Sequence, residues 1–244
     1  MTHPGFPNEE VPPITFGFWF FFDFFFRGST CDDFDFDGTM VTVPFLAQNY
    51  SVDGVMHDYY CREISFGNTD DIHIIRFDPV VAEEDSYVKE VIIYECDSDA
   101  VLDSCLPPPE ECQFLYSLAW GSSSFCLPSE AGFRATPETR YLLQIRYSNP
   151  DDDFITDNSG INVTYTTNLR NEDAGIVKVG VDHNELLVPG GEQSTIVTNE
   201  CPTECIQARI PPAGVTAFAS RFSGHLYLQS VVTESSEDRE NMEL

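Results

Sequence analysis

The sequence predicts an all-β protein in which an antiparallel, jelly-roll-like β-sandwich domain is followed by a partial second β-sandwich domain. From Thr39 onward, apolar residues alternate with polar ones or come in short β-branched runs, as expected of strands. Turn-rich pieces separate these runs at spacings typical of antiparallel sandwiches, and no amphipathic helical pattern is visible. With 42% hydrophobic residues, the 244-residue chain can bury a core.

The expected strands follow one another along both domains. In chain order they are Met40–Phe45, Ile72–Phe77, Val88–Tyr94, Tyr141–Tyr147, Ile161–Thr167, Ile176–Val181 and Ser194–Val197. Turns are expected at Leu106–Pro109, Ser148–Pro150 and Pro189–Gly191. A composition shift at Asn168–Ala174 marks the expected joint between the domains.

The chain divides into four expected segments: a hydrophobic leader at 1–30, the first sandwich at 31–169, a truncated second domain at 170–232 and an acidic disordered tail at 233–244. The leader contains the apolar run Ile14–Phe26, which Asp23 interrupts and which is shorter than the ~20 residues of a membrane span. Acidic residues precede this run where a signal peptide would be basic. We interpret it as an unusual leader, with a buried strand as the alternative, and expect no stable membrane span.

The strong acidity of the chain limits its partners. Twelve Lys and Arg against 41 Asp and Glu give a net charge of -29. Such a field repels nucleic acid and anionic membranes and attracts amines or metal ions, although acidic surfaces also serve solubility alone. We therefore expect no nucleic-acid partner.

The eight cysteines indicate disulfides, because no CxxC pair is present that would suggest a zinc ribbon or a thioredoxin-type motif. Disulfides imply an oxidising compartment. Two N-glycosylation sequons agree with this, one beginning at Asn49 and the other at Asn162. The sequence thus predicts a glycoprotein that is secreted or held in the lumen of the secretory pathway.

No local motif assembles a metal site. The five histidines are scattered without HxH or HExxH spacing, and His73, alone in an expected strand, is interpreted as structural or exposed. Asp33, Asp35 and Asp37 begin like a calcium loop, but the bidentate Glu that such a loop requires is replaced by Pro44. A solvated strand or acidic loop is the alternative interpretation.

Three ordered stretches of the chain carry a family resemblance. The first contains Asp58–Cys61, Ile72–Pro79 and Val91–Cys96, the second Arg140–Pro150 and Asp157–Ile161, and the third Cys201–Cys205, Ile210–Gly214 and Phe218–Leu226. Read in this order, they are similar to the copper type II, ascorbate-dependent monooxygenase family, which includes dopamine beta-hydroxylase and peptidylglycine alpha-hydroxylating monooxygenase. The resemblance implies two β-sandwich domains with one copper each, ascorbate as reductant and hydroxylation of an aliphatic carbon.

Most copper-ligand positions that the resemblance implies do not hold histidine. The three ligands of the electron-transfer copper correspond to Lys89, Glu90 and Arg146, which we expect to form a charged cluster. At the catalytic copper, Ser223 replaces one histidine and His225 remains, while the family's methionine ligand lies in a region that the chain lacks. Ammonium and guanidinium groups offer copper no lone pair, so full two-copper hydroxylation is not expected.

The resemblance also implies disulfide pairs, Cys61 with Cys105 and Cys96 with Cys112. Cys201 and Cys205 match cysteines whose family partners lie in the absent part of the second domain. They are left to pair with each other, with Cys31 or Cys126, or with a partner chain.

Three functions follow from these observations. The first, which we favour, is a copper-free pseudoenzyme that acts as a binding or scaffold protein for a small amine or peptide. The second is a residual copper- and ascorbate-dependent monooxygenase that uses one copper at His225. The third is an acidic calcium-binding surface protein that uses Asp33, Asp35 and Asp37.

Overall fold

The computed structural model describes residue 31 and residues 38–55, 57–81, 87–97, 100, 108–119, 122–177, 195–197 and 215–219. The chain forms two compact units, one comprising Ser29–Ile176 and the other Met1–Gly28 with Val177–Leu244. The expected domain boundary at residue 169 falls inside the first of these units and stays a prediction. Within the described ranges there is no α-helix, and hence no helix that could cross a bilayer.

All the strands of the described ranges belong to the unit Ser29–Ile176. They are β1 (Met40–Leu46), β2 (Tyr50–Val52), β3 (Asp58–Ile64), β4 (Ile72–Val80), β5 (Val88–Cys96), β6 (Cys112–Ala119), β7 (Phe125–Cys126), β8 (Ala131–Ala135), β9 (Arg140–Tyr147), β10 (Ile155–Asp157), β11 (Gly160–Thr166) and β12 (Glu172–Asp173).

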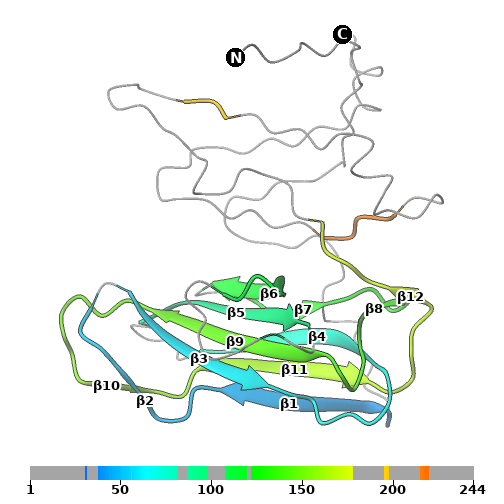
Figure 1. Ribbon diagram of the computed structural model, residues 1–244, viewed down its shortest axis with the longest axis horizontal. Helices are drawn as coiled ribbons and strands as arrows, with labels where there is room; N and C mark the ends of the chain where they lie inside the picture. Colours follow the sequence, from blue (N-terminus) through cyan, green and yellow to red (C-terminus); the bar gives the residue numbers. More distant parts are fainter. Residues whose placement is uncertain are drawn as a thin grey trace. The chain divides into compact units, whose positions relative to one another are not determined.

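These strands form a sandwich of two main sheets (Figure 1). The first sheet has the order β1-β11-β4-β8-β12, with β7 also paired to β4, and the second has the order β3-β9-β5-β6. A short β10-β2 ribbon lies apart from both. All pairs are antiparallel except β12 with β8. The all-β, antiparallel sandwich expected from the sequence is therefore confirmed.

Central and edge strands differ in composition as their positions require. The central strand β9 (RYLLQIRY) has five consecutive buried residues, since both of its faces are covered. The edge strand β1 (MVTVPFL) leaves most of its residues exposed or half-buried. The apolar run in the sequence thus marks the strand at the centre of its sheet.

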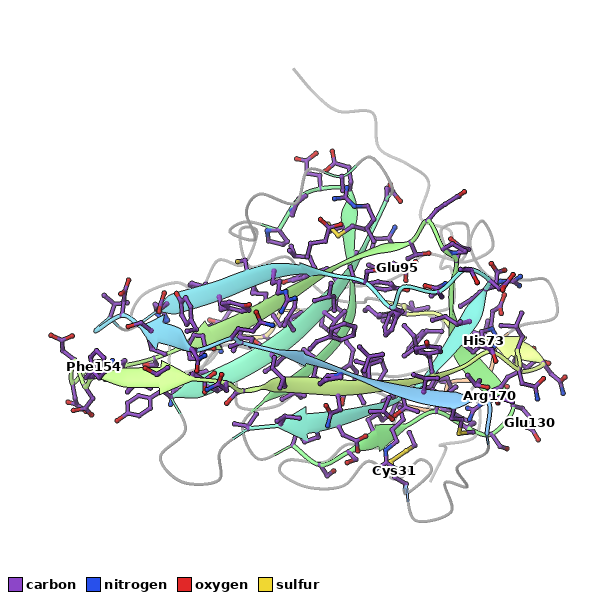
Figure 2. All side chains as sticks on the ribbon, turned by 90° about the horizontal axis from the view of Figure 1, so that it is seen from below. Cys31, His73, Glu95, Glu130, Phe154 and Arg170 are labelled. Atoms are coloured by element: carbon purple, nitrogen blue, oxygen red, sulfur yellow. A yellow bond between two sulfur atoms is a disulfide. The ribbon has the colours of Figure 1, made fainter. Side chains whose placement is uncertain are left out.

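Aromatic side chains join the two sheets through the core (Figure 2). Phe77 of β4 stacks on Tyr116 of β6 with 4.1 Å between ring centroids. Phe66 makes edge contacts with Phe45, Tyr141 and Tyr165, which come from three different strands. Each fully buried side chain of this size contributes about 1.5–3 kcal/mol, so this layer holds the sandwich together.

Two disulfides are present in the described residues. Cys96 and Cys112, the pair that the resemblance implies, are bonded and lie opposite each other in the β5–β6 ladder. Cys31 and Cys126, whose pairing the sequence leaves open, are bonded to each other across 95 residues of chain. Cys61 is also disulfide-bonded. Its expected partner Cys105, together with Cys201 and Cys205, lies outside the described residues.

Five of the expected strands correspond to β1, β4, β5, β9 and β11. The prediction is wrong at Ile176–Val177 and at 195–197, which are not in strands; the remaining residues of those two runs lie outside the described ranges. In both places the β-branched pattern is not matched by burial, because Ile176, Val177 and Ile196 are exposed. A run of β-branched residues without a buried face does not specify a strand.

Candidate functional site

The three positions that the resemblance equates with copper ligands lie where β5 and β9 run side by side. Glu90 of β5 is directly opposite Arg146 of β9. The register shifts between Val88 and Glu90, so Lys89 is an inserted residue at a β-bulge. The Arg146 Nη2 atom is 3.7 Å from the Glu90 Oε2 atom, which is an ion pair without hydrogen-bond geometry.

Polar and aromatic side chains surround this ion pair. Tyr59 of β3 is the other register partner of Arg146. Tyr94 lies on the same side of β5 as Glu90 by strand periodicity, and its hydroxyl donates to Gln144 of β9 at 3.4 Å. Burial, followed by the negative charge of Glu90 and then Tyr59, raises the pKa of Tyr94 to about 12. We call these five residues, Tyr59, Glu90, Tyr94, Gln144 and Arg146, the Glu90–Arg146 site.

The ion pair is half-buried. The side chains of Arg146 and Glu90 are 41% and 20% exposed. The Arg146 Nε atom is buried and has no hydrogen-bond partner among the described residues. A long ion pair with this much solvent contact contributes at most about 1 kcal/mol. The ion pair itself therefore contributes little to the stability of the sandwich.

The chemistry of these side chains does not fit a copper ion. Copper in proteins prefers imidazole and sulfur ligands, and the site as defined contains neither, while its carboxylate, Glu90, is already paired with a guanidinium. An ammonium at Lys89 adds a second positive charge next to it in the sequence. Within the described ranges there is also no group of three or more His, Cys, Asp or Glu residues that could hold a metal ion.

The other predicted site residues are placed as follows. His225, Ser223, Asp33, Asp35 and Asp37 lie outside the described residues. Both sequon asparagines are described, with Asn49 exposed and Asn162 half-buried in β11. Among the described residues, the structure brings together Glu90 and Arg146 of the predicted copper-ligand positions, besides the predicted Cys96–Cys112 disulfide.

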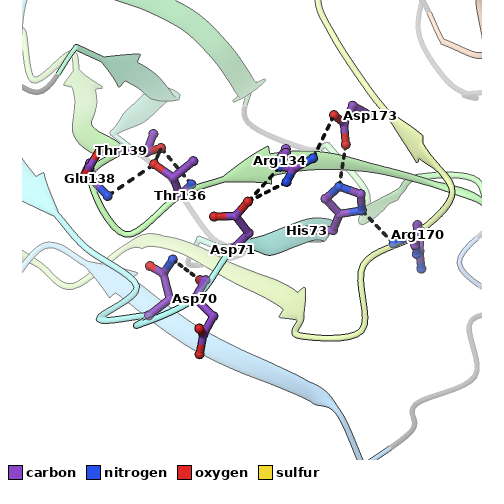
Figure 3. Close-up of polar contacts among 10 residues, drawn as sticks. Asp70, Asp71, His73, Arg134, Thr136, Glu138, Thr139, Arg170 and Asp173 are labelled. Atoms are coloured by element: carbon purple, nitrogen blue, oxygen red, sulfur yellow. Dashed lines mark hydrogen bonds and ion pairs between the residues drawn. The ribbon is translucent and has the colours of Figure 1, made fainter.

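His73 of β4 is a buried polar side chain that contacts residues 170–173 at the end of the first unit (Figure 3). Its ring is 1% exposed. Its Nδ1 accepts a hydrogen bond from the Arg170 backbone N–H at 2.9 Å. The neutral ring therefore carries its proton on Nε2, which donates to the Asp173 carboxylate at 2.8 Å. His73 is thus structural, one of the two alternatives that the sequence favours.

Further charged contacts extend this arrangement. Arg134 of β8 forms ion pairs with Asp71 at 2.6 Å and with Asp173 at 3.5 Å. The Arg170 guanidinium donates to the backbone carbonyls of Pro128 and Ala131. We call Asp71, His73, Arg134, Arg170 and Asp173 the His73 cluster. The contacts of the His73 cluster hold residues 170–173 against β8, and β12 pairs there with β8 as the last strand of the first sheet.

The fold and the Glu90–Arg146 site define an acidic, disulfide-linked β-sandwich protein whose charged pair joins two neighbouring strands. Residues 43–153 match the model of the copper type II ascorbate-dependent monooxygenase N-terminal domain, and residues 172–244 match that of the C-terminal domain. The chain belongs to the copper type II ascorbate-dependent monooxygenase family.

Curated relatives support the same assignment. Human dopamine beta-hydroxylase is 30% identical over 223 residues, which cover 83% of this chain and 36% of the relative. Canine dopamine beta-hydroxylase is 31% identical over 189 residues, covering 70% of this chain and 30% of the relative. Human DBH-like monooxygenase protein 1 is 29% identical over 175 residues, covering 63% and 28%. The chain thus spans about a third of the length of the relatives it matches.

Proposed function

We propose that this chain is a copper-independent binding or scaffold protein built on the monooxygenase fold. The observation that carries the proposal is the Glu90–Arg146 ion pair across β5 and β9, at two of the three positions that the resemblance equates with ligands of the electron-transfer copper. A guanidinium at such a position opposes a bound cation and provides no lone pair.

Electrostatics gives the size of this effect. Two like unit charges 4 Å apart repel by about 4 kcal/mol at an effective dielectric constant of 20. A copper ion held by Glu90 would meet one such charge, the Arg146 guanidinium, which also competes with the metal for the carboxylate. Family members that transfer electrons through a copper ion at this position need that metal. A chain that binds no copper here would keep the fold without the reaction.

The binding partner that fits this chain best is a small amine or a peptide with a free amino group. The net charge of -29 attracts cations over several ångströms. The Glu90 carboxylate is already paired with Arg146, so the acidity of the chain as a whole, and not the Glu90–Arg146 site, supports this choice. The disulfides support action in the secretory pathway or outside the cell.

Copper content and Cu(I) affinity of the oxidised full chain test the proposal. We expect less than about a tenth of a copper per chain, because no complete ligand set is expected at either position. Near one tightly held copper in the unaltered chain would overturn the proposal. If that copper disappeared in His225→Ala, the residual monooxygenase would be the correct function.

A gain-of-function variant provides the matched control. Lys89→His, Glu90→His and Arg146→His together restore three imidazoles on β5 and β9, and we expect this triple variant to bind one Cu(I). No gain in the folded triple variant would show that these positions are not the site. Calcium titration with an Asp35→Asn control checks the third function, which we expect to fail.

A further inference from the structure

The two sequons differ in their positions in the fold, although they are equivalent as sequence motifs. Asn49 is exposed and lies in the bend between β1 and β2. Its backbone has a positive φ of 51°, a conformation that asparagine tolerates better than most residues. Ser51, which completes the sequon, is exposed in β2.

A reciprocal contact with Asn158 orients the Asn49 side chain. The Asn49 backbone N–H donates to the Asn158 Oδ1 atom at 2.9 Å, and the Asn158 Nδ2 atom donates to the Asn49 Oδ1 atom at 3.3 Å. This arrangement engages the oxygen of the Asn49 carboxamide and not its nitrogen, which is the atom that receives a glycan. An attached glycan would leave both of these hydrogen bonds intact.

The second sequon is held inside a sheet. Asn162 lies in β11 between Pro44 of β1 and Asp78 of β4, and its side chain is half-buried. Thr164, which completes this sequon, is 0% exposed, and its hydroxyl is 2.8 Å from the Thr42 hydroxyl. A glycan attached to Asn162 before folding would have to fit against two neighbouring strands, so molecules that carry it would fold poorly.

We infer that Asn49 is an N-glycan acceptor and that Asn162 stays unmodified in the folded, secreted protein. The inference rests on passage through the secretory pathway, which is part of the proposed function, and goes beyond it in assigning the modification to one residue. An oligosaccharide at the β1–β2 bend would cover the end of the exposed edge strand β1.

The test is expression of the full chain behind a cleavable secretion signal in a eukaryotic cell, followed by glycosidase treatment and peptide mass spectrometry. We expect conversion to aspartate, the mark of a removed glycan, at Asn49 and not at Asn162. Ser51→Ala and Asn49→Gln should each abolish the glycan, whereas Ser51→Thr, which preserves the sequon, should retain it. Asn162→Gln should leave the mobility of the protein unchanged.

Three outcomes would overturn the inference: secreted, disulfide-bonded protein without a glycan, a glycan on Asn162, or a glycan that survives Ser51→Ala. The same chain without the added signal tests routing separately. If that form stayed inside the cell while the signal-bearing form was modified at Asn49, the proposed secretion would fail and the assignment of the acceptor would stand.

Discussion

The Glu90–Arg146 site and the His73 cluster both join charged or titratable side chains across neighbouring strands, yet the sandwich encloses them to different degrees. The Glu90–Arg146 pair is half-exposed and 3.7 Å long. The His73 ring is 1% exposed, and both of its nitrogens make hydrogen bonds shorter than 3.0 Å. The ion pair at the positions that correspond to copper ligands should thus contribute less to stability than the contacts of His73.

His73→Ala should have the largest effect on stability. It removes two buried hydrogen bonds and leaves a cavity beside β8, which together cost about 3 kcal/mol. Chemical denaturation measures the difference. The exposed His57 is the matched control, and His57→Ala should change the free energy of unfolding by less than about 0.5 kcal/mol. Equal effects of the two substitutions would contradict the enclosed role of His73.

Gly132→Ala should destabilise the unit by about 1–3 kcal/mol, because an added Cβ would lie 2.5 Å from the His73 Cβ atom. Gly175→Ala is the control, since nothing lies within 4 Å of its added Cβ. Thermal unfolding of the two variants provides the comparison. If Gly132→Ala were as stable as Gly175→Ala, the packing of β8 against His73 would be looser than the structure shows.

A double-mutant cycle with Glu90→Gln and Arg146→Gln should give a coupling energy of about 0.2–1 kcal/mol, as for other partly exposed ion pairs. The coupling should fall further in high salt because solvent reaches both side chains. A coupling as large as the His73→Ala effect would remove the contrast between the two regions.

Substitutions of two glutamates of the second sheet, Glu95 in β5 and Glu63 in β3, should change the free energy of unfolding the least. The two changes should have opposite signs. Burial, then the nearby Asp97, raises the pKa of Glu95, so its charge opposes folding above that pKa and the penalty disappears as the pH falls. Glu95→Gln should therefore stabilise the protein slightly at neutral pH and have no effect in acid.

Glu63 behaves in the opposite way. The hydrogen bond from Arg140 lowers the pKa of Glu63, so its contribution is present above the unfolded value of 4.5 and is lost as the pH falls through the folded value. Glu63→Gln should destabilise the protein slightly at neutral pH and not in acid. Chemical denaturation of Glu95→Gln and Glu63→Gln from pH 3 to pH 7 measures both changes in the free energy of unfolding. If the two changes had the same sign at neutral pH, the opposite directions given for the two pKa shifts would be wrong.

Sequence patterns could predict the strands that lie at the centres of the sheets. β4 and β9 are apolar on both faces, and their runs are visible without a structure. β3 was not predicted, because its exposed residues Cys61, Arg62 and Glu63 interrupt any alternation. The resemblance gave the positions Lys89, Glu90 and Arg146, but only strand register shows that Glu90 faces Arg146.

The partners of His73 could not be found from the sequence. Asp173 is 100 residues further along the chain, and the Arg170 contact involves a backbone N–H, which every residue except proline carries. The Cys31–Cys126 disulfide likewise does not follow from the sequence, because spacing alone does not determine connectivity. Long-range contacts of this kind become visible only through the topology of the sheets.

The pairing of β1 with β11 also determines how long β1 remains unpaired while the chain is synthesised. Thr42 and Thr164, which are bonded across this ladder, are 122 residues apart. At a translation rate of about 5–20 residues per second, roughly 6–24 s pass between the synthesis of β1 and that of its partner β11. During that interval its backbone is an unpaired edge that other chains can add to. The newly made chain therefore exposes an unpaired edge strand until β11 has been synthesised.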